Sequence, residues 1–339
     1  MKPSSLGDIV QSLPFLHVLR RGFPEATIAW VVGRPNLDVL SGHPDLDEVI
    51  VFERERWGGT RGFFGSLNEL SRFARTLRKR RFDLVVDLQG LLRSGLLSYV
   101  TGAPERVGFA NAREMSRLFY NRRVEVPNPD MHAVDRYLLV AKQIGLDTNG
   151  PVRFDVPVPK EAERFARDYL ASANGEGWPV VVLLPVSRWP TKRWPPERFA
   201  ALADRVAHEL GAAVLFLGAA DDVPLVEHIR TQMKQPSLSL VGRTTLKRSA
   251  ALLRWASVVV ANDSGPMHLA VVLGVPVVAL YGPTSPERTG PYGGRTRVFR
   301  STRECAPCFR SRCDNPECMR DIAVDDVFGA VGEFMESKR

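Results

Sequence analysis

The feature that most constrains the fold is an alternation of short β-branched segments with longer amphipathic ones. TIAWVV (27–32), EVIVF (48–52) and DLVVDLQ (83–89) have the composition of strands. LNELSRFARTLRKR (67–80) and HAVDRYLLVAKQIG (132–145) have the periodicity of helices, and a glycine ends the second one. This order predicts an α/β fold with a parallel sheet and helices on both faces.

The alternation is interrupted once and then resumes. The proline-rich segment 151–162 has neither helical nor clean strand periodicity, which makes it the predicted linker. Behind it, strands are predicted at 179–185, 212–218, 238–242, 257–263 and 275–282, with helices near 196–210, 222–233, 246–255 and 266–273. The second half is therefore another α/β domain of the doubly wound type, whose ligands bind beyond the carboxyl ends of the strands.

The expected organisation is two Rossmann-like domains, because 339 residues exceed what one core usually supports. We assign residues 1–150 to the first domain, 151–162 to the linker, 163–325 to the second domain and 326–339 to a C-terminal helix. Only three residues precede the loop SSLGD, whereas a doubly wound unit normally opens with a strand. The first strand is thus missing from its usual place, and we expect the natural start to lie upstream.

The charge balance indicates an anionic partner. The chain carries 46 basic and 38 acidic residues, a formal net charge of +8, which suits nucleic acid, an anionic membrane surface or a phosphorylated substrate. The arginines are interspersed with no recognition module, so we expect no nucleic acid partner. Neither a run of about 18 apolar residues nor an apolar signal core is visible, which predicts a cytoplasmic protein.

The four cysteines are gathered near the C-terminus with the spacing C-x2-C-x4-C-x4-C. In a reducing compartment, clustered thiols favour metal binding over disulfides. A strong zinc signature has two CxxC pairs, whereas this segment has one. Two interpretations stay open, a structural zinc site and reduced thiols that pack a loop. The residues concerned are Cys305, Cys308, Cys313 and Cys318.

The segment NDSGPMHLA follows a predicted buried strand directly. Asp263 lies at the carboxyl end of that strand, and Pro266 suits the first turn of the next helix. Gly265 permits close approach of a ligand, and the free amides of a helix N-terminus attract phosphate. His268 is predicted to point back to the same place. Capping and core packing explain each residue alone, but together with YGPT at the next strand end they predict an anion site.

Three further loops carry polar groups. SRWPTKRWP (187–195) supplies the Ser187 hydroxyl and the Lys192 ammonium, which suit a diphosphate, although a solvated charge run is the alternative. Asp222 follows the next strand, where it would bind a ribose or cap a helix. Asp8, beside Gly7, is either a helix N-cap or a general base held near a cleft.

Seven segments occur in one order along nearly the whole chain: SSLGDIVQSLPFL, VVDLQGLLRSG, AREMSRLFYNRR, MHAVDR, SRWPTKRWPPERF, NDSGPMHLA and LYGPTSPERTGPYG. Together they resemble glycosyltransferase family 9, the lipopolysaccharide heptosyltransferases, and the first half is most similar to the heptosyltransferase I type. The resemblance implies the GT-B architecture, two Rossmann-like domains facing across a cleft, with the acceptor on the first and the nucleotide sugar on the second. It also implies a C-terminal helix that crosses back and inverting transfer that requires no cofactor or metal.

The resemblance implies a role for each candidate residue. Asp8 is implied as the catalytic base that takes the proton of the acceptor hydroxyl. The implied nucleotide-sugar residues are Ser187 and Lys192 on the phosphates, Asp263 on heptose hydroxyls, Ser264 and Gly265 as backbone phosphate donors, His268 near the diphosphate and Asp222 on the ribose. The implied acceptor residues are Ser4, Ser5, Gly7, Arg56, Arg113 and Arg136.

The implied reaction moves L-glycero-D-manno-heptose from ADP-heptose to the Kdo region of the lipopolysaccharide inner core. The implied partners are ADP-heptose, a Kdo-lipid A type acceptor and the anionic inner membrane, at whose cytoplasmic face the enzyme would act peripherally. The cysteine cluster is not a feature of type I enzymes, so a family 9 enzyme with another acceptor, of heptosyltransferase II type or for another surface glycan, stays open. A nucleotide-sugar 2-epimerase and an inactive nucleotide-sugar binding protein are the remaining alternatives.

Overall fold

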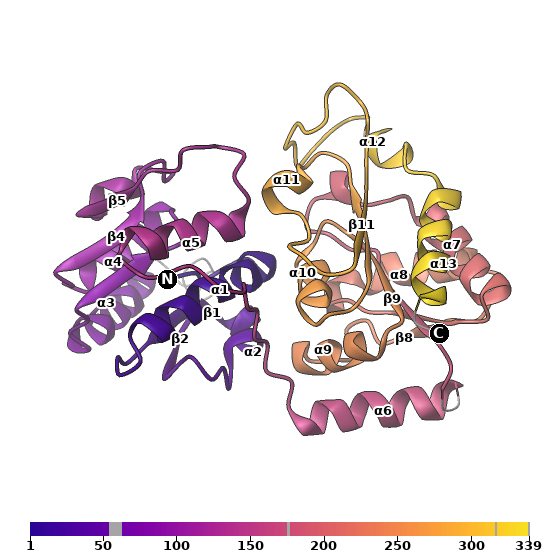
Figure 1. The fold of residues 1–339 in the computed structure, drawn as a ribbon, viewed down its shortest axis with the longest axis horizontal. Helices are drawn as coiled ribbons and strands as arrows, with labels where there is room; N and C mark the ends of the chain where they lie inside the picture. Colours follow the sequence, from indigo (N-terminus) through magenta and orange to yellow (C-terminus); the bar gives the residue numbers. More distant parts are fainter. Residues whose placement is uncertain (54–62, 175–176, 316, 338–339) are drawn as a thin grey trace. The chain divides into compact units, whose positions relative to one another are not determined.

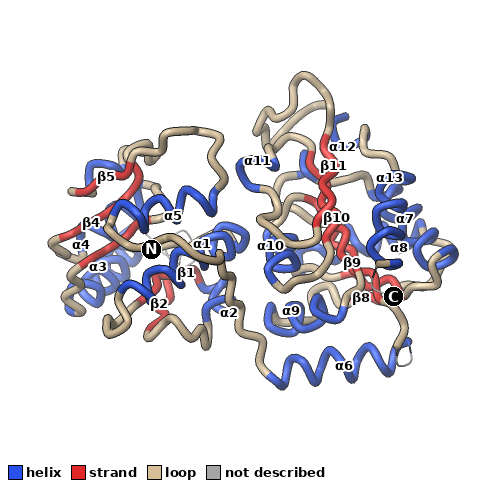
Figure 2. Tube along the Cα trace, viewed as in Figure 1, coloured by secondary structure: helices blue, strands red, loops and turns tan. Residues whose placement is uncertain are grey.

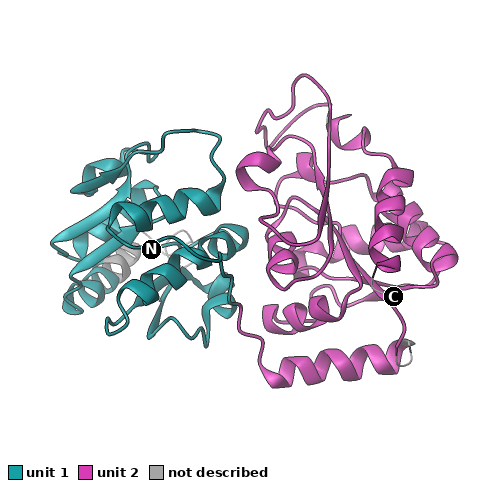
Figure 3. Cartoon of the chain, in the orientation of Figure 1, with its two compact units in different colours: residues 1–155 teal, residues 156–339 magenta. Residues whose placement is uncertain are grey.

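The chain divides into two compact units. The computed structural model describes residues 1–53, 63–174, 177–315 and 317–337, and side chains are described from residue 71 onward in the helix that begins at residue 63. Unit 1 comprises Met1–Asp155 and unit 2 comprises Val156–Arg339 (Figure 3). The boundary falls inside the proline-rich segment 151–162. Helices and strands alternate within each unit (Figure 2).

Unit 1 is built on short parallel strands. Its elements are α1 (Leu6–Gly22), β1 (Ala29–Gly33), η1 (Arg34–Asn36), α2 (Leu37–Leu40), β2 (Glu48–Phe52), α3 (Phe63–Lys79), β3 (Leu84–Asp87), α4 (Leu92–Val100), β4 (Glu105–Phe109), η3 (Ser116–Phe119), β5 (Arg122–Val124) and α5 (Ala133–Gln143) (Figure 1). β1 pairs with β2, and β3, β4 and β5 pair in that order, all in parallel.

Residues 1–3 lie between these two sets of strands. The Leu88 amide donates to the Met1 carbonyl (3.1 Å), and the Met1 nitrogen donates to Val86. On the other side, the Gly33 amide donates to the Pro3 carbonyl (2.9 Å). The central position that we expected to be missing is therefore filled, without a regular strand, and the backbone groups beside it are paired. Counting this segment as the first strand, unit 1 has the order 3-2-1-4-5-6 of a Rossmann sheet.

Helices cover both faces of unit 1. Phe15 of α1 and Tyr137 of α5 lie in one buried cluster with Val107 of β4. Leu77 of α3 and Leu97 of α4 lie in a second cluster, against β1 and β2. The first domain is thus doubly wound, as predicted.

Unit 2 contains one six-stranded parallel sheet. Its elements are α6 (Lys160–Asn174), β6 (Val180–Leu184), η4 (Pro190–Lys192), α7 (Pro196–Glu209), β7 (Ala213–Phe216), η5 (Ala220–Asp222), α8 (Val223–Gln232), β8 (Leu238–Ser239), α9 (Leu246–Trp255), β9 (Val258–Asn262), α10 (Gly265–Val272), β10 (Val277–Tyr281), α11 (Pro286–Thr289), β11 (Thr296–Arg300), α12 (Glu317–Arg320) and α13 (Val324–Glu336). The strand order is β11-β10-β9-β6-β7-β8. The chain starts in the middle at β6, fills one side and then crosses to β9, so β6 and β9 form the topological switch point.

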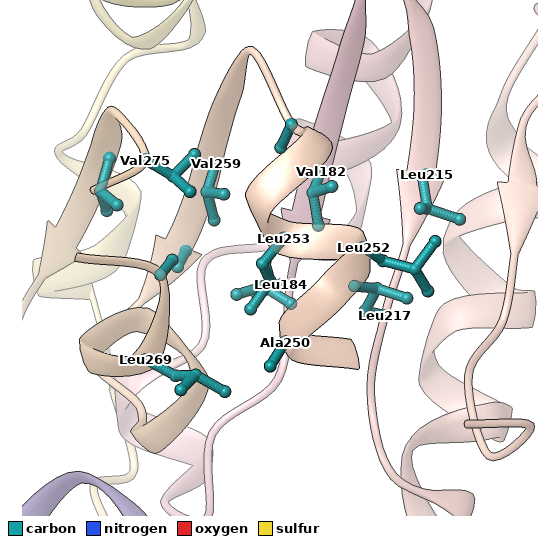
Figure 4. Close-up of a cluster of buried hydrophobic side chains, with 14 of the residues drawn as sticks. Val182, Leu184, Leu215, Leu217, Ala250, Leu252, Leu253, Val259, Leu269 and Val275 are labelled. Carbon is teal, nitrogen blue, oxygen red and sulfur yellow. The ribbon is translucent and has the colours of Figure 1, made fainter. Parts of the chain in front are cut away.

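The core of unit 2 explains its apolar strands. Every residue of β6, β9 and β10 is buried, because α6, α9 and α10 cover one face and α7, α8 and α13 cover the other. Leu253 of α9 lies beside Leu184, and Leu252 points towards Leu215 and Leu217 (Figure 4). The predicted C-terminal helix is α13, and it packs on α7 within unit 2.

Several elements were not predicted, and glycines inside them account for two. Gly108 weakens the strand pattern of the β4 sequence, and the structure needs it because an added Cβ would lie 2.3 Å from the Tyr120 ring. Gly95 weakens the helix pattern of the α4 sequence, and here an added Cβ would lie 2.9 Å from Ser116 of η3. β5, α6 and β11 were also missed. In α6, the preceding prolines obscured an amphipathic pattern.

Candidate functional site

The best-formed polar cluster of unit 2 lies at its switch point. β6 ends at Leu184 and β9 at Asn262, and the two strands are hydrogen-bonded neighbours. Parallel neighbours end at the same edge, so residues 185–195 and 263–264 emerge side by side there. Ligands of doubly wound sheets bind at this place.

Asp263 is the centre of the cluster. Its Oδ2 accepts hydrogen bonds from Lys192 Nζ (2.6 Å) and from Thr284 Oγ1 (2.7 Å). The Ser187 hydroxyl donates to the Asp263 main-chain carbonyl (3.0 Å). The carboxylate is 7% exposed, and a charge so deeply buried requires partners of this kind. The structure therefore brings Ser187, Lys192 and Asp263 together.

Hydrogen bonds and a cation–π contact fix the basic loop 187–195. The Asn262 side chain accepts from the Trp194 amide (3.1 Å) and donates to the Pro185 carbonyl (2.7 Å). The Arg193 guanidinium donates to the Ser187 carbonyl (2.9 Å), so this cation fixes the loop. The Lys192 ammonium lies 4.6 Å from the centre of the Trp189 ring. These contacts distinguish the segment from a solvated charge run.

The hydroxyl of Ser264 lies at the same edge of the sheet. It is the N-cap residue of α10, yet its side chain makes no capping hydrogen bond. The hydroxyl is buried and has no hydrogen-bond partner among the described residues. Asp263 does not cap the helix either, since its carboxylate binds Lys192 and Thr284. The capping interpretation of both residues is therefore wrong.

The first turn of α10 adds dipolar groups. Gly265 is its first residue, and the first amides of a helix have no acceptor within the helix. Such amides, together with the helix dipole, attract anions. His268 is buried in the same turn. Its predicted direction towards the anion site stays a prediction.

Asp222 is occupied locally. Its Oδ2 accepts the amide of Ala219, the residue that precedes η5 (2.8 Å). Asp222 is also the N-cap residue of α8, but its side chain makes no capping hydrogen bond to that helix, so the helix-capping interpretation is wrong. The contact with ribose remains a prediction.

Thr284 was missed as a site residue because its partner lies 21 positions away. It follows β10, and a cavity of about 310 Å³ opens beside it, lined also by Gly282, Ser285 and Arg303. The cysteine-containing loop supports this region: the Phe309 amide donates to the Pro283 carbonyl (2.8 Å). The motif YGPT was the signal, but the sequence does not show that its threonine binds Asp263.

Asp8 is the central polar residue of the unit 1 site. It is the third residue of α1, and Ser5, the N-cap, donates to its Oδ2 through its hydroxyl (2.6 Å) and its amide (3.0 Å). The Lys2 ammonium lies 3.4 Å from its Oδ1. Asp8 therefore closes the first turn of the helix without being its N-cap. Its side chain is still 40% exposed, which leaves it accessible to an acceptor.

Electrostatics keep the Asp8 carboxyl ionised. Burial raises its pKa, but the Lys2 ammonium and the hydrogen bonds from Ser5 outweigh burial, so the pKa lies below its ordinary value. Burial likewise disfavours the Lys2 charge, but Asp8 and Tyr137 outweigh it and raise the pKa of Lys2 to about 12. Lys2 also donates to the Leu88 carbonyl (3.2 Å) and lies 5.3 Å from the centre of the Tyr137 ring. Lys2 was missed because two of its partners are distant in sequence: Leu88 just after β3 and Tyr137 of α5.

The predicted acceptor residues are only partly gathered. Ser4 lies beside Asp8, and its amide donates to Gln89 Oε1 (3.4 Å), after β3. Gly7 is buried in the first turn of α1. The Arg136 guanidinium lies 5.2 Å from the centre of the Phe109 ring, and its charge is among those that influence Tyr137.

The two remaining predicted arginines show no side-chain contact with Asp8 or lie outside the described residues. Arg113 is exposed in the loop after β4, and its amide donates to the Gly90 carbonyl (3.0 Å). Arg56 lies outside the described residues.

The cysteines are not arranged as a metal site. All four are free thiols, with Cys305 and Cys313 exposed. Tetrahedral zinc would bring its sulfur ligands within about 4 Å of one another. Among the described residues, no three of these sulfurs lie within 4.8 Å of one another. The ligand atoms of His17, Asp45 and Asp155 in unit 1 do lie within that distance of one another. Burial raises the pKa of the Cys318 thiol.

Within the described ranges, no helix combines the length and the apolar character that are needed to cross a bilayer.

Known proteins are similar to this chain along nearly its whole length. Lipopolysaccharide heptosyltransferase 1 of Pseudomonas aeruginosa is 32% identical over 334 residues, which span 96% of this chain and 90% of that protein. The crystal structure of the glycosyl transferase family 9 from Veillonella parvula has a TM-score of 0.85 at 28% identity, covering 98% of this chain and 95% of that one. E. coli heptosyltransferase WaaC with ADP-2-deoxy-2-fluoro heptose has a TM-score of 0.72 at 25% identity, covering 100% and 98%.

The fold and the family agree with the prediction from the sequence. Each unit is a doubly wound Rossmann-like sheet, and the similar solved structures have the GT-B fold. Residues 70–319 match the family described as Glycosyltransferase family 9 (heptosyltransferase). The chain belongs to glycosyltransferase family 9, the heptosyltransferase family.

Proposed function

We propose that this enzyme transfers L-glycero-D-manno-heptose from ADP-heptose to the Kdo region of the lipopolysaccharide inner core, with inversion at the anomeric carbon. The relatives support the donor and the pathway, since one is a lipopolysaccharide heptosyltransferase 1 and another binds an ADP-heptose analogue. The observation that carries the proposal is Asp8, a carboxylate held ionised by Lys2 and Ser5 yet 40% exposed.

In the proposed reaction, Asp8 accepts the proton of the acceptor hydroxyl as its oxygen attacks the anomeric carbon. The bond from that carbon to the diphosphate breaks, and ADP leaves with the electron pair. A base with a lowered pKa is weak, but it is ionised over the whole physiological range. Its contribution is therefore a fixed acceptor position as well as proton removal.

The departing diphosphate needs positive or dipolar groups. We assign this role to Lys192, the Ser187 hydroxyl, and the amides of Ser264 and Gly265, with His268 nearby. The unpartnered Ser264 hydroxyl supports a ligand at this edge of unit 2. In the proposal, Asp263 binds heptose hydroxyls and Asp222 binds the ribose, and these charge-neutralising groups make a catalytic metal unnecessary.

The proposed acceptor is acidic and lipid-linked. We assign Ser4, Ser5, Gly7, Arg56, Arg113 and Arg136 to acceptor binding. A Kdo-lipid A type acceptor implies an enzyme at the cytoplasmic face of the inner membrane, in peripheral contact with anionic lipid. A family 9 enzyme with another acceptor is the second candidate, favoured by the cysteine-containing loop that supports Pro283.

The test is ADP release with ADP-heptose and Kdo-lipid A, comparing the wild type with Asp8→Asn. We expect release that requires the acceptor and falls at least about 100-fold in the variant, the lower range for loss of a general base. ADP release without acceptor would indicate hydrolysis of the donor, and interconversion of the donor sugar without acceptor or net ADP release would indicate an epimerase. Transfer to a heptose-bearing core but not to Kdo-lipid A would favour the second candidate, and full activity of Asp8→Asn would remove Asp8 as the base.

A further inference from the structure

Unit 1 exposes large apolar side chains on α4 and on the neighbouring turn η3. Eleven large hydrophobic residues are exposed in the described part of the chain, and five of them lie here, with exposed fractions from 38% to 67%. Scattered apolar residues on a surface need no explanation, whereas a gathered set marks an interaction site. We call this set the apolar patch: Leu92, Leu96, Tyr99, Met115 and Leu118.

The members of the patch lie on two elements that pack against each other, α4 and η3 with its N-cap Met115. The three α4 members are spaced i, i+4 and i+7, which places them on one face of the helix. η3 packs directly on α4, since a Cβ on Gly95 would lie 2.9 Å from Ser116 and 3.0 Å from Phe119. The rings of Tyr99 and Phe119 are 5.9 Å apart. The two elements therefore present their apolar side chains together.

Exposed arginines lie on or next to the same two elements as the patch. Arg93 of α4, Arg117 of η3 and Arg113 just before η3 are all exposed. None of the three forms an ion pair with a carboxylate among the residues that the structure describes. One acid lies among them, Glu114, and its carboxylate accepts the Leu92 amide (3.1 Å) at the start of α4. The two elements thus carry exposed apolar side chains together with exposed positive charge.

We propose that the apolar patch and its arginines dock on an anionic lipid bilayer. Each arginine near such a surface strengthens binding about fivefold, and apolar side chains enter the boundary between headgroups and acyl chains. Tyr99 has the amphipathic ring that suits this boundary. A second copy of the chain fits less well, because a two-fold interface would bring the same arginines against one another.

The patch adjoins the proposed acceptor site within unit 1. Gln89 accepts the Ser4 amide, and α4 begins three positions later at Leu92. The loop that carries Arg113 is bound to Gly90. Docking through the patch would therefore hold the Ser4–Asp8 segment close to the lipid surface. This last step rests on the proposed function, whereas the docking itself does not.

The experiment measures co-sedimentation of the full chain with phosphatidylglycerol–phosphatidylethanolamine vesicles and with phosphatidylcholine vesicles, without sugar donor. One variant removes charge, Arg93→Gln with Arg117→Gln, and another removes apolar surface, Leu96→Gln with Leu118→Gln. The matched controls are Arg167→Gln on α6 and Trp255→Gln on α9, both exposed in unit 2. Thermal unfolding of each variant verifies the fold.

We expect binding to anionic vesicles that weakens with salt and is at least tenfold weaker to phosphatidylcholine. The charge variant should bind about 25-fold more weakly and the apolar variant about tenfold more weakly, with both controls within about twofold of the wild type. Equal binding to both vesicle types, or no effect of either patch variant, would overturn the proposal. So would a dimer in the absence of vesicles that the apolar variant dissociates.

A second readout separates this proposal from the proposed function. ADP release with a delipidated, water-soluble acceptor should be the same in wild type and patch variants. If the patch variants lose vesicle binding but keep this activity, docking and transfer are both supported, each by its own measurement. Vesicle binding in a protein that releases no ADP would leave the docking surface standing and remove the proposed reaction.

Discussion

Lys2→Met removes the buried cation beside the proposed base. The Lys2 ammonium lies 3.4 Å from Asp8 Oδ1. At that distance two unit charges attract by about 5 kcal/mol at an effective dielectric constant of about 20, and by about 1 kcal/mol in water. The Asp8 side chain is 40% exposed, so the interaction lies towards the lower value, about 1–2 kcal/mol. That energy corresponds to about one pKa unit of Asp8.

The expected result is a shift of the pH–rate profile. A general base acts only when ionised, so kcat/KM falls on the acid side as Asp8 is protonated. The wild type holds the pKa of Asp8 below its ordinary value, and Lys2→Met should move the acid limb up by about one pH unit. The assay is ADP release from about pH 2.5 to about pH 9, a range that includes the acid limb. Lys2→Arg, which keeps the charge, is the control and should stay close to the wild type.

Two results would refute this reasoning. An acid limb of Lys2→Met that coincides with the wild type would show that Lys2 does not set the pKa of Asp8. A large loss of the plateau with an unshifted limb would place Lys2 on the acceptor instead. Stability gives an independent check, because the pKa of Lys2 rises from 10.5 to about 12 on folding. This stabilisation is complete below about pH 10.5 and lost as the pH rises through about 12, so the wild type should lose up to about 2 kcal/mol more than Lys2→Met over that range.

Three further outcomes follow from unit 2. Gly282→Ala would place a Cβ 2.5 Å from Met319 Sδ, so it should lower the free energy of unfolding by about 1–3 kcal/mol in a denaturant titration. The control is Gly332→Ala in α13, where a Cβ meets open space and the change should be neutral or stabilising. Thr284→Val removes a donor to buried Asp263 and should cost about 1–3 kcal/mol of stability and raise KM for the donor; unchanged values would make that bond dispensable. Thiol titration of the unfolded protein should count four reduced cysteines, with less than one equivalent of zinc by elemental analysis; stoichiometric zinc would contradict the separation of the sulfurs.

The sequence predicted the unit 2 site better than the unit 1 site, and topology explains the difference. In unit 2, regular apolar strands precede both loops, so the order of elements alone places Lys192 and Asp263 at one edge of a parallel sheet. They lie 2.6 Å apart. In unit 1, residues 1–3 hold the central position and show no strand periodicity. They pair with β1 and with the β3 side of the sheet, and the hydrogen bond between Met1 and Leu88 joins positions more than 80 apart in the sequence.

Side-chain partners were the least predictable part of both sites. Lys2 resembles any basic residue near a chain end, and only the fold shows that it is buried between Asp8, Leu88 and Tyr137. The Ser264 hydroxyl has the sequence context of a helix cap, yet it makes no such bond. Long-range burial therefore decides these roles, because local propensity says only that a polar group needs a partner.

The final prediction follows from the separate roles proposed for the two sites, diphosphate binding in unit 2 and proton removal in unit 1. If Lys192 binds the diphosphate, removing its charge should weaken ADP binding, whereas removing the charge of Asp8 should not. A hydrogen bond to a charged group contributes about 1.5–3 kcal/mol, so Lys192→Met should raise the Kd for ADP about 10- to 150-fold in a calorimetric titration. The same change leaves Asp263, 7% exposed, without its cation, so the fold of the variant must be verified by thermal unfolding.

Ser187→Ala provides the milder variant. It removes one hydroxyl from the same loop and leaves the Lys192–Asp263 pair intact, so weaker ADP binding in it cannot come from an unpaired carboxylate. Asp8→Asn should retain the Kd of the wild type while transfer is lost. Normal ADP binding in both loop variants would move the diphosphate away from the switch point of unit 2. Weak binding in Asp8→Asn would show that Asp8 acts on the donor, and the assignment of base and leaving-group sites to separate units would then be wrong.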